Sequence, residues 1–203
     1  MTKIKTQYFS KQISNIFHPL ILSPLTFILL FVNLEGKNYF SFFYLVMIIF
    51  TTSIIPYIYV LQMKKNGEIK NIDIPDRKKR QKPFVKGTSL FLLTAILLML
   101  FRAPQQFTSI MLIYTINTGL ATLITKYWKI SVHGLSLGIP IATLGLLISK
   151  KYFYLASFLP LLIYSRVKLK AHTVSQVFAG FSLGLILTIV QIKLVWPELV
   201  LLD

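Results

Sequence analysis

Residues 165–176 read SRVKLKAHTVSQ and place a run of basic side chains at the start of an apolar segment. Arg166 and His172 stand six positions apart, with Lys168 and Lys170 between them. Charge held against an apolar helix costs free energy unless an anion or a counter-charge lies beside it. The stretch therefore predicts an anion-binding site at a membrane surface. We interpret much of the remaining chain as the scaffold that delivers further groups to this site.

The composition predicts a polytopic membrane protein. The chain has 203 residues, of which 55% are hydrophobic and 14% are charged, and the apolar residues form long runs. There is no cysteine, which excludes disulfides, a thiol nucleophile and a cysteine-based zinc site. The acidic residues all lie outside the middle of the apolar runs, so metal–carboxylate chemistry inside the bilayer is not expected: Glu35, Glu68, Asp73, Asp76, Glu198 and Asp203.

The net charge of +16 indicates anionic partners. These are anionic phospholipid headgroups or a phosphorylated lipid substrate, because the basic residues lie between hydrophobic segments. The same distribution argues against nucleic acid as a partner. The first fifteen residues mix three lysines with apolar side chains and predict an interfacial segment rather than a cleavable signal peptide.

Seven apolar segments predict an all-α transmembrane bundle of six to seven spans. They are Leu20–Leu34, Tyr39–Met63 with a kink at Pro56, Gly87–Phe101, Gln106–Trp128, Ile130–Ser149, Tyr152–Val167 and Ala171–Leu194. Polar residues in the fourth (Tyr114, Asn117, Thr118 and Thr122) suggest a face buried against protein, and Ala179, Gly180 and Gly184 in the seventh favour close helix packing. We divide the single domain into an N-terminal part, residues 1–69, and a core, residues 70–203.

The sixth segment is shorter than the roughly 20 residues that a span requires. We count it as a short or tilted span because the basic clusters then share one face of the membrane. With seven spans, most of the 22 lysines and arginines also lie on that face, including those of the longest loop, Lys64–Lys86. The positive-inside rule places this face in the cytoplasm.

Three polar clusters interrupt the apolar pattern. The first is the basic stretch 70–83, the second is 129–134 (KISVHG), and the third contains Ser165, Arg166, His172 and Gln176. Arginine and lysine bind phosphoryl oxygens, and histidine can attack phosphorus or give a proton to a leaving oxygen. Together the clusters predict phosphoryl chemistry at the membrane surface.

The order of these clusters resembles that of the type 2 phosphatidic acid phosphatase family, which shares its core with vanadium haloperoxidases. That family has a lysine, six residues and Arg-Pro; then Pro-Ser-Gly-His; then Ser-Arg, five residues, His, three residues and Asp. Lys70 and Arg77 have the first spacing, although the proline is displaced and Arg80 with Pro83 offers a second alignment. The resemblance extends over roughly residues 70–190.

The second and third motifs match more closely. Ser131-Val132-His133 has valine in place of glycine, and Ile130 stands where the family has proline. Ser165-Arg166 is followed after five residues by His172, and Gln176 occupies the position of the aspartate.

The resemblance implies a metal-free mechanism without a cofactor. His172 would attack phosphorus, and His133 would protonate the leaving oxygen and later activate water. The phosphoryl oxygens would be held by Lys70, Arg77 or Arg80, Ser131 and Gly134 through their amides, and Arg166. The implied substrate is phosphatidic acid, phosphatidylglycerophosphate, or a polyprenyl phosphate or diphosphate.

Gln176 is the important departure from the family pattern. On a helix it shares a face with His172, and its carbonyl oxygen can accept a hydrogen bond but brings no charge. Two other functions therefore stay open. One is a phospholipid-binding or complex-assembling protein without turnover. The other is a membrane prenyltransferase, suggested by Asn71, Asp73, Asp76 and Arg77, although the chain has one such motif where two are needed. The sequence does not determine the oligomeric state.

Overall fold

The computed structural model describes residues 3–33, 37–74 and 76–200, and every regular element in these ranges is a helix. Five helical stretches are long and apolar enough to cross a membrane: Lys5–Asn33, Tyr39–Lys65, Arg77–Leu100, Gln105–Tyr127 and Val174–Val195. The all-α fold expected from the sequence is therefore confirmed, and the length and composition of these helices indicate a membrane protein.

The chain folds into two compact units. The first unit combines residues 1–22 with residues 129–203, and the second contains residues 23–128. The N-terminal segment thus belongs with the last third of the chain, because its buried side chains pack there rather than against the helices that follow it.

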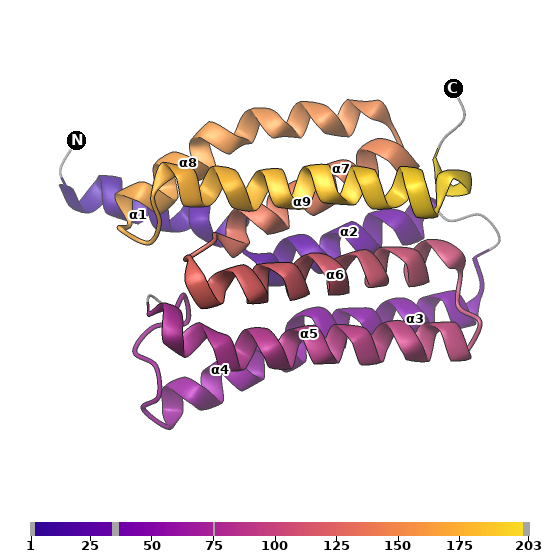
Figure 1. Cartoon of the computed structure of the whole chain (residues 1–203), viewed down its shortest axis with the longest axis horizontal. Coiled ribbons are helices and arrows are strands. Elements are labelled where there is room, and N and C mark those ends of the chain that lie inside the picture. The colour runs from indigo at the N-terminus through magenta and orange to yellow at the C-terminus, as the bar shows by residue number, and fades with distance from the viewer. Residues whose placement is uncertain (1–2, 34–36, 75, 201–203) are drawn as a thin grey trace. The chain divides into compact units, whose positions relative to one another are not determined.

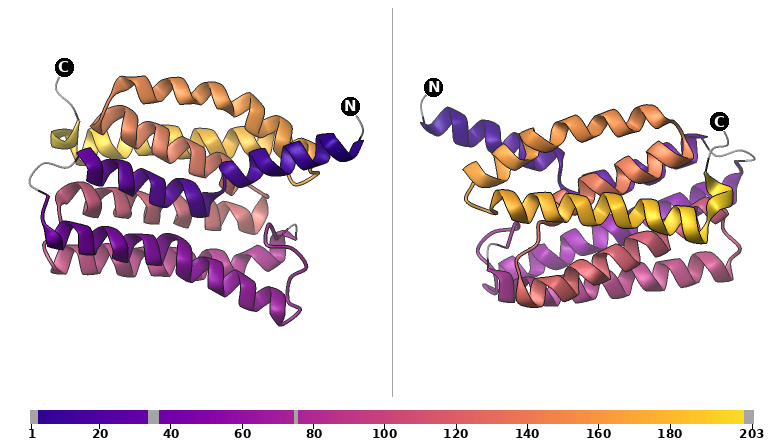
Figure 2. Two further views of the ribbon diagram at one scale, coloured as in Figure 1. Left: turned by 180° about the vertical axis from the view of Figure 1, so that it is seen from behind. Right: turned by 45° about the horizontal axis from the view of Figure 1, so that its top comes forward.

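The first unit is built from α1 (Lys3–Ile16), α7 (Val132–Leu147), α8 (Leu159–Lys168) and α9 (Val174–Val195). It also contains the 3₁₀ helices η2 (Lys150–Phe158) and η3 (Pro197–Leu199), and the first turn of α2 (Pro19–Asn33). Figures 1 and 2 show α7 and α9 side by side, with η2 and α8 beside them.

Glycines allow α7 and α9 to approach backbone to backbone. A Cβ atom at Gly134 would lie 2.8 Å from Phe181 N, and one at Gly138 would lie 2.6 Å from Leu185 N. On α9, Gly180 and Gly184 meet the backbone of α7 in the same way. Each helix thus carries two glycines four residues apart, the spacing that favours close contact between membrane helices. This confirms the packing role expected for Gly180 and Gly184.

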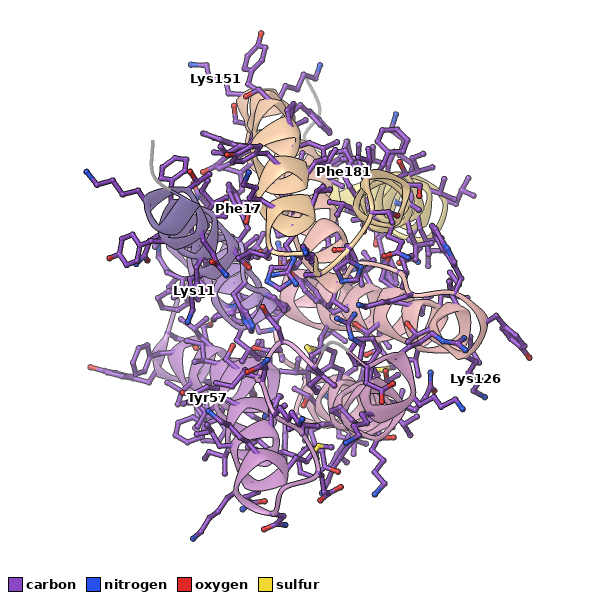
Figure 3. The ribbon with its side chains drawn as sticks, turned by 90° about the vertical axis from the view of Figure 1, so that its left-hand side faces the viewer. Lys11, Phe17, Tyr57, Lys126, Lys151 and Phe181 are labelled. Atoms are coloured by element: carbon purple, nitrogen blue, oxygen red, sulfur yellow. The ribbon has the colours of Figure 1, made fainter. Side chains whose placement is uncertain are left out.

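An apolar core joins α1 to the rest of the first unit. Ile13 and Phe17 are buried against Leu162 of α8 and Phe181 of α9, among other residues of α7 and α9. Figure 3 labels Phe17 and Phe181, which lie near the ribbon of η2 and α8. The sequence separation between α1 and α8 is large, so this contact depends on the tertiary fold.

The second unit contains the rest of α2, together with α3 (Tyr39–Ile49), α4 (Ile55–Lys65), α5 (Arg77–Leu100) and α6 (Gln105–Tyr127). A π-helical turn, η1 (Phe50–Ile54), lies immediately before Pro56. Proline lacks an N–H and its ring clashes with the preceding turn, and the wider π-turn accommodates both effects at the expected kink.

The polar face of α6 is buried, as expected. Tyr114 and Asn117 are almost fully buried and Thr122 is 6% exposed. The Tyr114 hydroxyl donates to Thr26 Oγ1 at 3.2 Å, and its ring packs on Phe27. These polar groups therefore serve helix packing in the second unit.

The third apolar segment starts earlier than the sequence suggested. We expected a loop up to Lys86 and a helix from Gly87, whereas α5 begins at Arg77. The Asp76 side chain accepts a hydrogen bond from Lys78 N at 2.9 Å and caps the helix. Because lysine and arginine are good helix formers, the basic stretch continues the apolar helix toward its N-terminus.

Candidate functional site

The second and third polar clusters meet in the first unit. They lie where α7 and α9 begin and where α8 ends, and α1 adds two serines to them. The side chains of Ser131, His133, Arg166 and His172 are all buried. The structure thus brings together residues from motifs about thirty positions apart in the sequence.

Arg166 lies at the centre of this arrangement and is 1% exposed. Its Nη1 donates a short hydrogen bond to Ser14 Oγ and lies 3.5 Å from His133 Nε2. Ser14 Oγ is itself 3.4 Å from the same nitrogen of His133. Lys168 and Lys170 of the same stretch are exposed, so they are available to lipid headgroups.

Chemistry fixes the direction of one of these contacts. Guanidinium is a donor only, so Ser14 Oγ accepts from Arg166. The hydroxyl retains its proton and a second lone pair, so it donates to His133 Nε2 or accepts from it according to the protonation of the imidazole.

The backbone after α8 turns sharply and brings His172 back to Arg166. Ala171 N donates to Arg166 O at 3.0 Å and Lys170 N donates to Val167 O at 2.9 Å, the two hydrogen bonds of a Schellman motif. His172 N also donates to Arg166 O at 3.3 Å. The C-cap of α8 thus brings the backbone of His172 next to that of Arg166, although the two residues are six positions apart.

Lys170 holds the left-handed position of this motif, with φ of 52°. Glycine adopts that conformation without a Cβ clash, so Lys170→Gly is expected to stabilise the protein by about 1 kcal/mol. For a chain of this length the melting temperature would rise by about 2–4 °C. Lys168→Gly inside α8 is the matched control and should lower it. Thermal unfolding in detergent micelles measures both, and a lower melting temperature for Lys170→Gly would contradict the assignment.

Gln176 positions His172 through a capping box. Thr173 Oγ1 accepts from Gln176 N at 3.3 Å, and Gln176 Oε1 accepts from Thr173 N at 3.2 Å. The same Oε1 lies 3.0 Å from His172 Nδ1. An amide oxygen only accepts, so Nδ1 of His172 is the donor and Nε2 carries the lone pair. This is the tautomer that a nucleophile at Nε2 requires.

Gln176→Glu is expected to raise turnover by about fivefold if the site is catalytic, because a charged hydrogen bond to imidazole is about 1 kcal/mol stronger than a neutral one. Glutamate keeps the length of glutamine and is the usual residue at this position of a capping box. Aspartate, the family residue, is one methylene shorter and would strain the contact with Thr173 N. Phosphate release by Gln176→Glu and by Gln176→Asp, each compared with the wild type, measures the effect. Activity of Gln176→Glu equal to or below that of the wild type would contradict the prediction.

The amides expected to hold an anion have protein partners in this structure. Ser131 N donates to Gln176 O at 3.1 Å, and Gly134 N donates to Ser131 Oγ at 3.3 Å. Ser131 caps α7, and Gly134 permits contact with α9. Gly134 therefore serves the packing of α7 against α9, a role that was not predicted from the sequence.

The basic residues of the first motif belong to the second unit. Lys70 is exposed, and Arg77 donates to the backbone carbonyl of Lys126 at the end of α6. Arg80 is 4% exposed and donates from Nε to Ile74 O at 2.6 Å and from Nη2 to Asp73 O at 3.1 Å. Both arginines thus fix local backbone, and their contact with phosphate stays a prediction.

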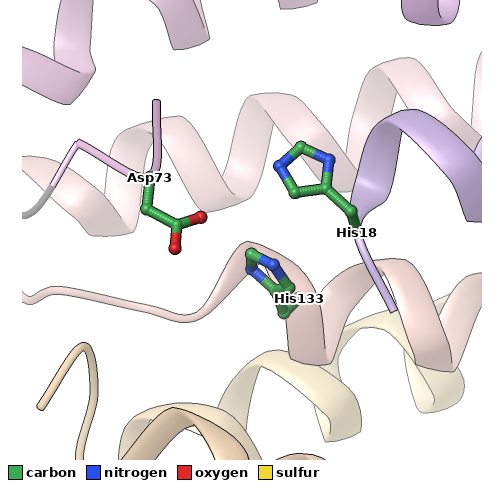
Figure 4. A group of neighbouring side chains, drawn as sticks. All are labelled: His18, Asp73 and His133. Carbon is green, nitrogen blue, oxygen red and sulfur yellow. The ribbon is translucent and has the colours of Figure 1, made fainter. Parts of the chain in front are cut away.

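Two residues near the second and third polar clusters were not predicted from the sequence: Ser14 of α1, and His18, which follows that helix. Ser14 shares the buried helix face of Ser10, Ile13 and Phe17, and this spacing is the signal that could have revealed it. The ring of His18 packs edge-to-face on His133 with centroids 5.1 Å apart (Figure 4). His18 Nδ1 accepts from Leu20 N at 3.2 Å, which fixes the ring at the start of α2.

No family model, curated protein or solved structure matches the chain. The assignment of a function therefore rests on the residues of the site and on their geometry.

Proposed function

We propose that this chain is an integral membrane lipid-phosphate phosphatase that works through a phosphohistidine. The observation that carries the proposal is the arrangement of Arg166, His133 and His172. The guanidinium lies against His133, and Gln176 holds His172 in the tautomer that leaves Nε2 as the nucleophile. These are three residues that the motif resemblance assigns to one phosphoryl group.

The chemistry has two steps. Nε2 of His172 forms a bond to phosphorus while the bond from phosphorus to the lipid oxygen breaks, and protonated His133 gives a proton to that oxygen. Water then attacks the phosphohistidine, His133 takes its proton, and inorganic phosphate leaves. Arg166 holds the phosphoryl oxygens in both steps, where positioning and charge supply most of the catalysis.

We also propose seven spans, which would place the third cluster on the same face as the others. η2 has nine residues and α8 has ten. A 3₁₀ helix rises about 2.0 Å per residue and an α-helix about 1.5 Å, so the pair extends over roughly 33 Å if collinear. The hydrocarbon core is about 30 Å thick. The 3₁₀ geometry therefore supports a span that the residue count alone disfavours.

The test uses the purified full chain in detergent micelles without added metal. We expect it to release inorganic phosphate from at least one of phosphatidic acid, phosphatidylglycerophosphate and the polyprenyl phosphates, and orthovanadate to inhibit that release. Substrates that lack the phosphate group serve as blanks. Absence of release from all of them would overturn the enzyme proposal.

A second function is favoured by the neutral side chain of Gln176. Without a carboxylate, the site could bind the headgroup of a phosphorylated lipid and not turn it over. Binding of orthovanadate without phosphate release, by both the wild type and Gln176→Glu, is the result expected for such a protein. The prenyltransferase alternative has less support, because the Asp76 side chain caps α5.

A further inference from the structure

Ser14 is a buried hydroxyl that touches two groups of the candidate site. It is 2% exposed, accepts a hydrogen bond from Arg166 Nη1 and lies 3.4 Å from His133 Nε2. It comes from α1, whereas Arg166 belongs to α8 and His133 to α7. One oxygen atom thus lies where three helices of the first unit meet.

The proposed mechanism gives Arg166 and His133 one shared task. Arg166 binds the phosphoryl oxygens and His133 protonates the neighbouring oxygen that leaves, so the substrate must place oxygens in contact with Arg166 and with His133. In the structure the Ser14 hydroxyl makes both of these contacts. We propose that Ser14 is a further residue of this site, whose hydroxyl holds the place of a substrate oxygen until a phosphoryl group displaces it.

Displacement does not require α1 to leave the bundle. Ile13 and Phe17 anchor the helix in the apolar core, and Ser165 Oγ donates to Ser10 O at 2.6 Å. Ser136 Oγ also donates to Phe17 O at 3.3 Å. These contacts do not involve the Ser14 hydroxyl, which reaches another staggered position by rotation about χ1 alone. Rotation of a single side chain therefore exchanges a protein oxygen for a phosphoryl oxygen.

The hydroxyl consequently competes with anions for Arg166. Removing it in Ser14→Ala frees the Nη1 hydrogen bond, and the affinity for inorganic phosphate is expected to rise about tenfold, the effect of one hydrogen bond of this kind. Ser14→Thr keeps a hydroxyl and should bind phosphate like the wild type. Ser14→Cys, with a weaker acceptor of similar size, should lie between wild type and Ser14→Ala.

Ser10→Ala is the matched control. Ser10 is buried on the same face of α1, but its hydroxyl donates to Thr6 O within the helix at 2.9 Å. Phosphate affinity of Ser10→Ala should therefore equal that of the wild type. Isothermal titration of inorganic phosphate into the full chain in micelles measures all five proteins, and their melting temperatures verify folding. If Ser14→Ala does not fold, the comparison of Ser14→Cys with Ser14→Thr decides.

The outcomes separate this proposal from the proposed function on which it rests. Tighter phosphate binding by Ser14→Ala supports the displaced hydroxyl even if no lipid is hydrolysed, since titration requires no turnover. Unchanged or weaker binding by Ser14→Ala overturns it, and weaker binding would make Ser14 a phosphate ligand. Absence of phosphate binding by every variant also overturns it. The enzyme proposal fails separately, through the assay of phosphate release.

Discussion

Replacing His172 with alanine or asparagine is expected to abolish phosphate release, with turnover falling by at least about a thousandfold. The reason is the loss of the proposed nucleophile, which would divide the reaction into two easier steps. Asparagine retains a polar side chain of similar reach but has no nitrogen lone pair that can attack phosphorus. Alanine removes the imidazole entirely, whereas asparagine keeps a polar side chain of similar reach. Equal loss of turnover in both variants would therefore be due to the missing nucleophile and not to a change in packing.

A phosphoenzyme measurement makes this prediction sharper. Wild type quenched during turnover of a labelled substrate should carry label that is stable in base and lost in acid, and neither His172 variant should carry it. Lys168→Ala is the control, because Lys168 is exposed and lies in the same stretch. Its turnover should stay within a few-fold of wild type. Activity retained by His172→Ala would overturn the mechanism.

Replacing Gly180 is expected to have the largest effect on folding. A Cβ atom there would lie far inside van der Waals contact with Ser131 O and 3.1 Å from Ser131 C. Both are backbone atoms and neither can rotate away, so α7 and α9 must separate. Gly180→Ala should cost about 3 kcal/mol of unfolding free energy, and Gly180→Leu should prevent the native packing of the two helices.

The same contact links packing to the site. Ser131 caps α7 and its N–H donates to Gln176 O, so separating the helices also displaces the segment that holds His172 and His133. Gly87→Ala in α5 is the matched control, because nothing lies within 4 Å of its added Cβ. That variant should be neutral or up to about 1 kcal/mol more stable. Equal melting temperatures for Gly180→Ala and Gly87→Ala would contradict the close packing.

Features that depend on neighbouring residues could be predicted from the sequence. The apolar runs indicated helices able to cross a membrane, and the polar residues of α6 indicated a buried face. His172 and Gln176 are four residues apart, so their contact follows from helical geometry. The start of α5 was missed because its signal, an N-cap at Asp76, competed with the tendency of a charged run to be a solvated loop.

Contacts between distant residues were decided by the tertiary structure. Ser14 is 119 residues from His133 and 152 residues from Arg166, and no local pattern specifies that they meet. The same holds for His18 on His133 and for the glycines of α7 on the backbone of α9.

The physical reason for this division is the range of the forces that each feature depends on. Hydrophobicity, charge and helix geometry act over a few residues and can be seen in the sequence itself. Which helix faces which, and which hydroxyl fills the space beside Arg166, depend on packing summed over the first unit. For residues 165–176 the sequence by itself predicted that Arg166 and His172 belong to one anion-binding site, and the burial of Arg166 is seen only in the structure. The tertiary structure decided that α1 places Ser14 against Arg166 and His133, because Ile13 and Phe17 bury their side chains in the apolar core of the first unit.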